Sequence, residues 1–280
     1  MKKHFELNNG VEIPSIGFGT WQTPDGETAI SSIKTATTYG YRHIDTAAIY
    51  NNEKGVGIGI KECGIDRKDL FVTSKVWNSE RGYRSTLKAF EKSLSDLQLE
   101  YLDLYLIHWP ATPNKYSDWQ QINSDTWRAM EELYTGGKIR AIGVSNFLAH
   151  HLKPLLENAK IKPAVNQIEY HPGFKQNDCV KFCTENNILI EGWSPLGRGM
   201  VLDNDMLKEI AFKYQKSVAQ LCIRWALQKQ IVPLPKSITP QRIKENFEVF
   251  DFQISAADME LINEIGEFGG SGLHPDSIEF

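Results

Sequence analysis

The chain has 280 residues, of which 41% are hydrophobic, and this is enough for one large core if the fold is an α/β barrel. Its formal net charge is −4, and lysines are interspersed with acids, so nucleic acid is not an expected partner. No run of eighteen apolar residues occurs, and no apolar segment follows the two lysines at the start, so neither a membrane span nor a signal peptide is expected.

The first predicted element is a β-hairpin over residues 5–13. Its turn contains Asn9 and Gly10, the residue pair that favours the two positive backbone angles of a type I′ turn. We therefore expect a two-residue hairpin loop.

From there the chain alternates between short β-rich runs and stretches with helical periodicity. The β-rich runs lie at 15–19, 43–45, 70–75, 102–108, 140–144, 164–168, 188–193 and 231–235. Residues 83–97 and 218–227 are clear helical stretches, with apolar residues at steps of three and four. Gly40 and Gly136-Gly137 follow predicted helices, and Thr239-Pro240 begins another as N-cap and first helical residue.

Eight strands joined by helical crossovers predict an α/β fold, a (β/α)8 TIM barrel with an N-terminal β-hairpin. No linker or repeat divides the chain, so we expect a single domain over residues 1–280. A doubly wound dinucleotide fold is the main competitor, and it requires Gly-x-Gly-x-x-Gly after the first strand. Gly17-Phe-Gly19 and Gly55-Val-Gly57-Ile-Gly59 lack this pattern, which favours the barrel.

The cysteines and a histidine pair give no indication of a metal site. Four cysteines are too few for a disulfide scaffold, and they indicate a reducing, cytoplasmic setting. Cys179 and Cys183 share a helical face and are interpreted as buried thiols. Adjacent residues point to different parts of a helix, so we expect His150 and His151 to be surface residues.

Polar or aromatic side chains stand at the end of every predicted strand, where barrel enzymes keep their working residues. Individually they have ordinary explanations: Asp45 as a helix N-cap, Lys75 as a rim charge, His108 as a core histidine. Their joint placement at the ends of adjacent strands weakens these explanations. The strand ends are Thr20-Trp21, Asp45, Lys75, His108, Ser145-Asn146, Gln167, Trp193-Ser194 and Lys236-Ser237.

Asp45, Tyr50, Lys75 and His108 have the chemistry of a proton-donating site. A free tyrosine has a pKa of about 10, and a neighbouring ammonium favours its phenolate and eases proton release to an alkoxide. Lys75 supplies this charge, Asp45 holds the lysine, and His108 orients the substrate oxygen. Because the set contains no nucleophile–base pair, we expect the attacking group to be a hydride from a cofactor.

These residues lie within motifs that resemble those of the aldo-keto reductases, in the family's order and over nearly the whole chain. The motifs are Gly40-Tyr-Arg-His-Ile-Asp45-Thr-Ala-Ala-Ile-Tyr50, Phe71-Val-Thr-Ser-Lys75-Val-Trp77, Asp103-Leu-Tyr-Leu-Ile-His108-Trp-Pro110, Gly143-Val-Ser-Asn-Phe147, Asn166-Gln167, Trp193-Ser-Pro-Leu196 and Leu234-Pro-Lys-Ser237.

The resemblance implies an NADPH-dependent oxidoreductase that reduces small aldehydes and ketones, with Tyr50 as general acid and with Lys75, Asp45 and His108 as its partners. Ser145, Asn146 and Gln167 match positions that hold the nicotinamide carboxamide, and Trp193 matches the aromatic residue, often tyrosine, that stacks on the ring. The expected cofactor contacts are Gly19, Thr20, Trp21, Asp45, Ser145, Asn146, Gln167, Trp193, Ser194, Leu196, Lys236, Ser237, Ile238, Arg242, Glu245 and Asn246.

Residues 236–246 resemble the clamp for the adenosine 2′-phosphate. A lysine, a hydroxyl and an arginine at a helix start suit a dianionic phosphate, which favours NADPH over NADH. The alternative is an ordinary capped surface helix.

The remaining expectations concern the pocket and the partners. Trp21, Trp77 and Trp109 follow strand ends, and with Tyr50 and His108 they are the expected substrate contacts, although packing at the barrel rim is the alternative for the tryptophans. The segments after strand four (111–126) and after residue 266 are short, as in the compact bacterial branch with the diketogluconate and glyoxal reductases. We expect an open pocket for small carbonyl compounds, and the family implies a monomer.

Two other functions compete with this interpretation. One is a non-catalytic, nucleotide-sensing barrel subunit, which retention of all four catalytic residues disfavours. The other is a metal-dependent barrel hydrolase, which would need more His, Asp or Glu at strand ends than Asp45 and His108 supply.

Overall fold

The eight predicted strands form one parallel sheet in the computed structural model, which describes residues 3–278. The ends of the predicted domain 1–280 lie outside the described residues. Neighbouring strands in the sheet follow chain order, from β3 to β10. They are β3 (Gly17–Gly19), β4 (His43–Asp45), β5 (Phe71–Val76), β6 (Leu102–Ile107), β7 (Ile139–Ser145), β8 (Val165–Glu169), β9 (Leu189–Trp193) and β10 (Val232–Leu234).

The sheet closes into a barrel where β3 meets β10. The amide of Gly19 donates to the carbonyl oxygen of Pro235 at 3.0 Å. Close approach at this seam depends on Gly17, because a Cβ there would lie 2.4 Å from the Leu234 side chain. The (β/α)8 prediction is therefore confirmed.

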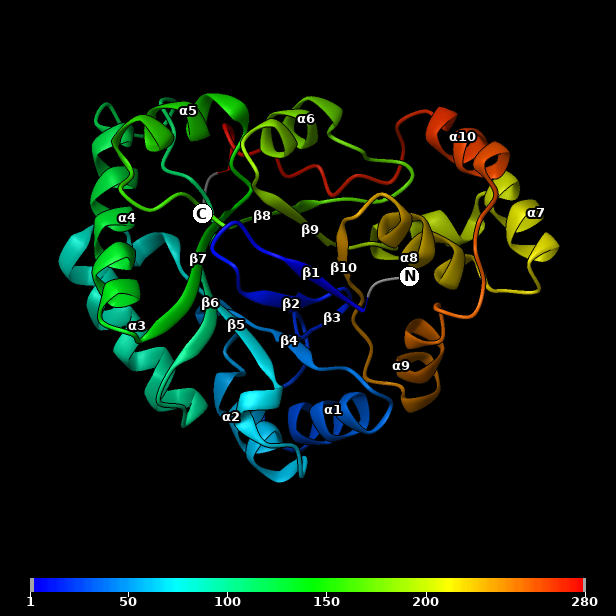
Figure 1. Ribbon diagram of the computed structural model, residues 1–280, viewed down its shortest axis with the longest axis horizontal. Helices are drawn as coiled ribbons and strands as arrows, with labels where there is room; N and C mark the ends of the chain where they lie inside the picture. The colour runs from blue at the N-terminus through cyan, green and yellow to red at the C-terminus, as the bar shows by residue number, and fades with distance from the viewer. Residues whose placement is uncertain (1–2, 279–280) are drawn as a thin grey trace.

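Helices surround the sheet, and α7 and α10 lie at its outer margin (Figure 1). The predicted helix 83–97 is confirmed as α3, and the stretch 218–227 forms α8. The helices are α1 (Glu27–Thr38), α2 (Glu53–Glu62), α3 (Tyr83–Leu97), α4 (Trp119–Thr135), α5 (Ala149–Asn158), α6 (Asn177–Glu185), α7 (Asp205–Lys213), α8 (Val218–Gln228), α9 (Pro240–Phe247) and α10 (Ala256–Glu264). The described residues also contain four 3₁₀ helices, η1 (Ala48–Tyr50), η2 (Arg67–Asp69), η3 (Asn78–Glu80) and η4 (Gly197–Asp203).

The predicted helix ends are confirmed, with one difference in detail. Gly40 and Gly137 have positive φ, at 110° and 74°, just beyond α1 and α4. Pro240 is the first residue of α9 after Thr239, but the Thr239 side chain does not cap the helix. Its backbone amide instead donates to Oγ of Ser237, at 3.0 Å.

The N-terminal hairpin is present, but the predicted type I′ turn is wrong. Strands β1 (His4–Glu6) and β2 (Glu12–Pro14) pair antiparallel, and Gly10 has φ of 81° while Asn9 is not among the residues with positive φ. The amide of Gly10 donates to Leu7 O and the amide of Leu7 donates to Val11 O. This is a three-residue loop, in which Gly10 alone needs the left-handed conformation.

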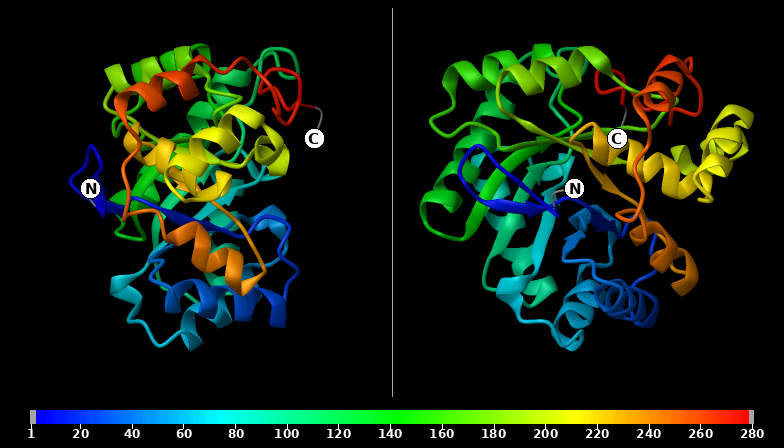
Figure 2. Two further views of the ribbon diagram at one scale, coloured as in Figure 1. Left: turned by 90° about the vertical axis from the view of Figure 1, so that its right-hand side faces the viewer. Right: turned by 45° about the vertical axis from the view of Figure 1, so that its right-hand side comes forward.

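This hairpin covers the N-terminal end of the barrel, and Figures 1 and 2 show it crossing that end of the sheet. Leu7 and Ile13 pack in one buried cluster with Phe71 and Leu104 from the barrel strands. Burial of these side chains closes one end of the barrel. The C-terminal strand ends remain available for the polar groups.

Three smaller predictions have clear outcomes. Cys179 and Cys183 are buried thiols on one face of α6, 3.5 and 3.4 Å from Nδ2 of Asn166. The glycine-rich run 55–59 lies in α2, where a Cβ on Gly57 would come within 2.2 Å of Leu97 O, so close helix packing explains it. The segment 111–126, which was predicted to be short, includes the first residues of α4, since this helix begins at Trp119. None of the helices in residues 3–278 is long and apolar enough to cross a membrane.

Candidate active site

Lys75 is the buried centre of the site. It lies on β5 with none of its side chain exposed, and Asp45 ends the adjacent β4. Its ammonium donates to Asp45 Oδ1 at 2.7 Å, to the carbonyl oxygen of Thr46 at 3.0 Å and to the Tyr50 hydroxyl at 3.4 Å. All three ammonium hydrogens are therefore used. Burial lowers the pKa of Lys75, but its interactions with Asp45 and with Tyr50 outweigh this effect, so the net pKa is raised and the lysine stays charged.

The direction of the Lys75–Tyr50 hydrogen bond orients the tyrosine proton. An ammonium can only donate, so the Tyr50 oxygen must accept, and its own hydrogen is free to point elsewhere. Tyr50 lines the central cavity, and its ring lies over Lys75, whose Nζ is 5.1 Å from the ring centroid. The phenol is therefore placed to donate into the cavity.

The pKa of Tyr50 differs from the sequence expectation. Burial raises it more than the Lys75 charge lowers it, so the net direction is upward. The sequence shows that an ammonium is near the phenol, but the desolvation of the phenolate depends on the folded structure. The consequence is a phenol that keeps its proton at neutral pH until an acceptor with developing negative charge arrives.

His108 follows β6, and its ring packs edge-on against the Tyr50 ring in the cavity lining, with ring centroids 5.6 Å apart. Burial and the charge of Lys75 hold its pKa well below the usual range, so the ring is neutral. A neutral imidazole has one N–H donor and can orient a substrate oxygen without competing as the acid. The indole of Trp77 packs edge-on against it, at a centroid distance of 5.1 Å.

A single cavity of about 1070 Å³ joins most of the predicted site residues. All five predicted substrate contacts line it, so Trp21, Trp77 and Trp109 form cavity wall. Thr20 and Ile238 are not among its lining residues: Thr20 is buried and donates to Asp45 O, and Ile238 is about half exposed. The predicted cofactor residues that do line it are Gly19, Trp21, Asp45, Ser145, Asn146, Gln167, Trp193, Ser194, Leu196, Lys236, Ser237, Arg242, Glu245 and Asn246.

Asn146 is held rigidly beside the catalytic groups. It follows β7 with φ of 63°, a conformation that asparagine tolerates better than most residues. Its amide nitrogen donates to His108 O and to Ser145 Oγ, both at 3.0 Å. Its oxygen accepts from Nε1 of Trp193 at 2.9 Å. This network fixes the Trp193 ring as part of the cavity wall.

Lys236, Ser237 and Arg242 line the same cavity near the start of α9. Lys236 is half-buried and Arg242 is exposed, and burial lowers the pKa of the lysine. Two cationic side chains and a hydroxyl at a helix start match the donor set for a phosphate dianion. The cavity lining thus carries groups whose chemistry suits a phosphate and groups that can donate a proton, and this set of residues fits NADPH.

Several lining residues were not predicted, among them Arg198, Leu202 and Leu273. Arg198 belongs to η4 and its guanidinium lies 5.2 Å from the centre of the Trp21 ring. Leu273 comes from the C-terminal segment, more than 150 residues from His108 in the sequence. Loop residues of this kind have no periodic signal, and only the proximity of Arg198 to the strand-end motif 193–196 could have indicated it.

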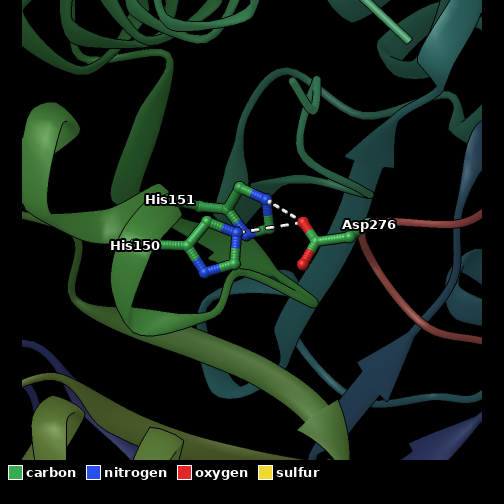
Figure 3. A group of neighbouring side chains, drawn as sticks. All are labelled: His150, His151 and Asp276. Carbon is green, nitrogen blue, oxygen red and sulfur yellow. Dashed lines mark hydrogen bonds and ion pairs between the residues drawn. The ribbon is translucent and has the colours of Figure 1, made fainter. Parts of the chain in front are cut away.

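The prediction for His150 and His151 is half wrong. His150 is exposed, but His151 is fully buried, and Nε2 of each lies 2.9 Å from Asp276 Oδ1 (Figure 3). Both residues lie in the first turn of α5, where the C-terminal segment passes over them. Burial lowers the pKa of His151 to about 4, so its ring is neutral. The amide of Leu148 donates to Nδ1, so the proton of this ring is on Nε2, the atom 2.9 Å from the carboxylate oxygen. The cluster therefore fastens the C-terminal segment, and its His151 nitrogen has no free lone pair to offer a metal.

Residues 15–267 match the profile described as the Aldo/keto reductase family. Among curated proteins, glyoxal reductase of Bacillus subtilis is 53% identical over 280 residues, covering 100% of this chain and 99% of the relative. The 9,11-endoperoxide prostaglandin H2 reductase of Trypanosoma cruzi is 49% identical over 275 residues, covering 97% of this chain and 94% of the relative.

Solved structures are similar over comparable lengths. An aldo/keto reductase from Brucella melitensis has a TM-score of 0.87 at 46% identity, covering 93% of this chain and 98% of that chain. A Gox0644 mutant solved in complex with NADPH has a TM-score of 0.92 at 40% identity, with 100% of both chains covered.

Proposed function

This chain belongs to the aldo/keto reductase family, and we propose that it reduces small aldehydes and ketones, including dicarbonyls of the glyoxal type, with Tyr50 as the proton donor. It is an NADPH-dependent oxidoreductase that acts on carbonyl groups. The observation that carries the residue assignment is the buried hydrogen-bond network in which Lys75 donates to both Asp45 and Tyr50, with Tyr50 lining the cavity. We further propose that the protein acts as a single-domain, cytoplasmic monomer.

The cofactor residues divide into two groups by position. Ser145, Asn146 and Gln167 lie at the strand ends beside Tyr50, and they would hold the nicotinamide carboxamide against the face of Trp193. Lys236, Ser237 and Arg242 would bind the 2′-phosphate at the start of α9. When bound, NADPH supplies a hydride to the carbonyl carbon of the substrate.

The chain's own residues then handle the proton. Neutral His108 donates a hydrogen bond to the carbonyl oxygen and orients it towards Tyr50. As negative charge develops on that oxygen, the Tyr50 O–H bond breaks and the proton moves to it, giving the alcohol. The phenolate that remains is stabilised by the Lys75 ammonium, and it regains a proton from solvent.

The glyoxal class is favoured by the wall of the cavity and by the relative at 53% identity. Three tryptophans line the same cavity as the proposed proton donor, and a compact carbonyl compound can reach it without a long complementary groove. A screen of NADPH consumption over glyoxals, aromatic aldehydes, sugar aldehydes and keto acids tests this. We expect the highest kcat/KM for small dicarbonyls, and a preference for bulky sugars would contradict the assignment.

A further inference from the structure

Glu191 is a buried carboxyl group that the mechanism above leaves unused. It lies on β9, two residues before Trp193, and none of its side chain is exposed. In the sheet register it stands beside Gln167 on β8. Its Oε2 accepts a hydrogen bond from Gln167 Nε2 at 2.8 Å.

Gln167 uses its amide nitrogen for two carboxyl groups at once. Nε2 donates to Asp45 Oδ2 at 2.8 Å as well as to Glu191. An amide nitrogen carries two hydrogens, so both are consumed and Oε1 is the one polar atom of the side chain left over. Gln167 also lines the central cavity, where the nicotinamide carboxamide would lie.

Rotation of this amide by 180° would bring its oxygen against two carboxyl groups. The two acceptors therefore select one orientation, and removal of Glu191 would leave that selection to Asp45 alone. We propose that Glu191 is a positioning residue that holds Gln167 Oε1 towards the cavity, where it accepts a hydrogen bond from the carboxamide nitrogen. This inference rests on the proposed function, because it assumes that the nicotinamide lies beside Tyr50.

The charge state of Glu191 is consistent with this role. Burial, together with the negative charge of Asp45, raises its pKa to about 8, although Gln167 and Lys75 act in the opposite direction. The other titratable neighbour, His43, is 3.6 Å away and neutral, since burial lowers its pKa to about 3. Oε1 has no hydrogen-bond partner among the described residues, and Oε2 is the oxygen that accepts from Gln167.

The test compares Glu191→Gln with Glu191→Leu. The glutamine keeps a carbonyl acceptor at the position of Oε2, whereas the leucine removes it. We expect Glu191→Leu to weaken NADPH binding about tenfold, measured by quenching of tryptophan fluorescence, as for loss of one well-aligned hydrogen bond. Glu191→Gln should stay within about twofold of wild type.

A probe without the nicotinamide separates positioning from general damage to the fold. Adenosine 2′,5′-bisphosphate occupies only the clamp at α9, so its affinity should be the same in wild type and both variants. Gln167→Ala supplies the matched background, in which Glu191→Leu should cause no further loss of NADPH affinity. Unchanged NADPH affinity in Glu191→Leu, or equal losses for NADPH and the bisphosphate, would overturn the proposal.

Two further outcomes are decisive. If Glu191→Leu does not fold, Glu191→Asp retracts the acceptor by one methylene and should weaken NADPH but not the bisphosphate; equal effects on both would refute the role. If the wild type binds NADPH yet reduces no carbonyl compound, the proposed function fails while the Glu191 comparison still stands. A wild type that does not bind NADPH would refute both.

Discussion

The ammonium of Lys75 and the carboxylate of Asp45 form an ion pair, 2.7 Å apart, at the base of the cavity. Neither side chain has more than 5% of its surface exposed. Because a buried charge depends on its partner, this pair keeps Lys75 charged and holds it against Tyr50.

Asp45→Asn should therefore destabilise the protein by about 3 kcal/mol or more, since it leaves the Lys75 ammonium buried without a counter-charge. Urea denaturation measures this free energy of unfolding. The matched control is Glu62→Gln, at a pair of side chains that are each about half exposed, 3.1 Å from Lys34. The control should cost at most about 1 kcal/mol. Equal losses of unfolding free energy in the two variants would show that the buried pair at Asp45 stabilises the protein no more than the exposed pair does.

Tyr50→Phe should lower kcat by roughly 10²–10⁴-fold, the usual contribution of a general acid, while NADPH binding stays unchanged. The matched control is Tyr83→Phe, which removes a hydroxyl that bonds Glu132 at the surface. Steady-state NADPH consumption and fluorescence quenching give the two measurements. Near-normal turnover in Tyr50→Phe would remove this residue as the proton donor.

Lys236→Ala and Arg242→Ala should each weaken NADPH about tenfold or more and change NADH affinity much less, because only NADPH carries the 2′-phosphate. The control is Lys160→Ala, because Lys160 is not among the residues that line the cavity. Fluorescence titration with both cofactors measures the ratio. An equal loss for the two cofactors would mean that the clamp assignment is wrong.

Glu191→Gln should be more stable than wild type above pH 5, and the difference should grow with pH. The folded pKa of Glu191 is raised from 4.5 to about 8, so between these values the folded state binds more protons than the unfolded state. The free energy of unfolding of the wild type therefore falls as pH rises through this window, by up to about 5 kcal/mol, and the glutamine variant lacks this pH dependence. Denaturation curves at pH 5 to 9 that run parallel for the two proteins would contradict it.

Asp276→Ala should loosen the C-terminal segment, because both histidines of α5 contact that carboxylate. Leu273 in the same segment lines the cavity, so KM for the carbonyl substrate should rise about fivefold while kcat changes less than twofold. Asp251→Ala, which removes a surface pair with Lys216, should leave both constants unchanged. Faster proteolysis near the C-terminus would accompany the effect, and an unaltered KM would argue against it.

Much of the barrel was predictable from the sequence because each strand is a short apolar run bounded by turn residues. β4 was placed at 43–45 to the residue, and the other strands within about two residues at each end. The hairpin turn was not, because Asn-Gly suits several loop types and the register of the two strands decides among them. The burial of His151 could not be predicted either, because the segment that covers it contains Asp276, which is far from His151 in the sequence.

The sequence by itself determined which groups reach the C-terminal end of the barrel. Side chains alternate along a strand and the working residues follow strand ends, so Asp45, Lys75 and His108 could be brought to one rim without coordinates. Tyr50 followed from the motif around Asp45.

Only the tertiary structure decided how these groups interact. Desolvation depends on what packs around a group in three dimensions, and this reversed the expected direction of the Tyr50 pKa. The pairing of Gln167 with both Asp45 and Glu191 joins three strands, and no local pattern encodes it. The C-terminal segment reaches the cavity through long-range contacts, so only the folded structure identifies Leu273 as a residue of the site.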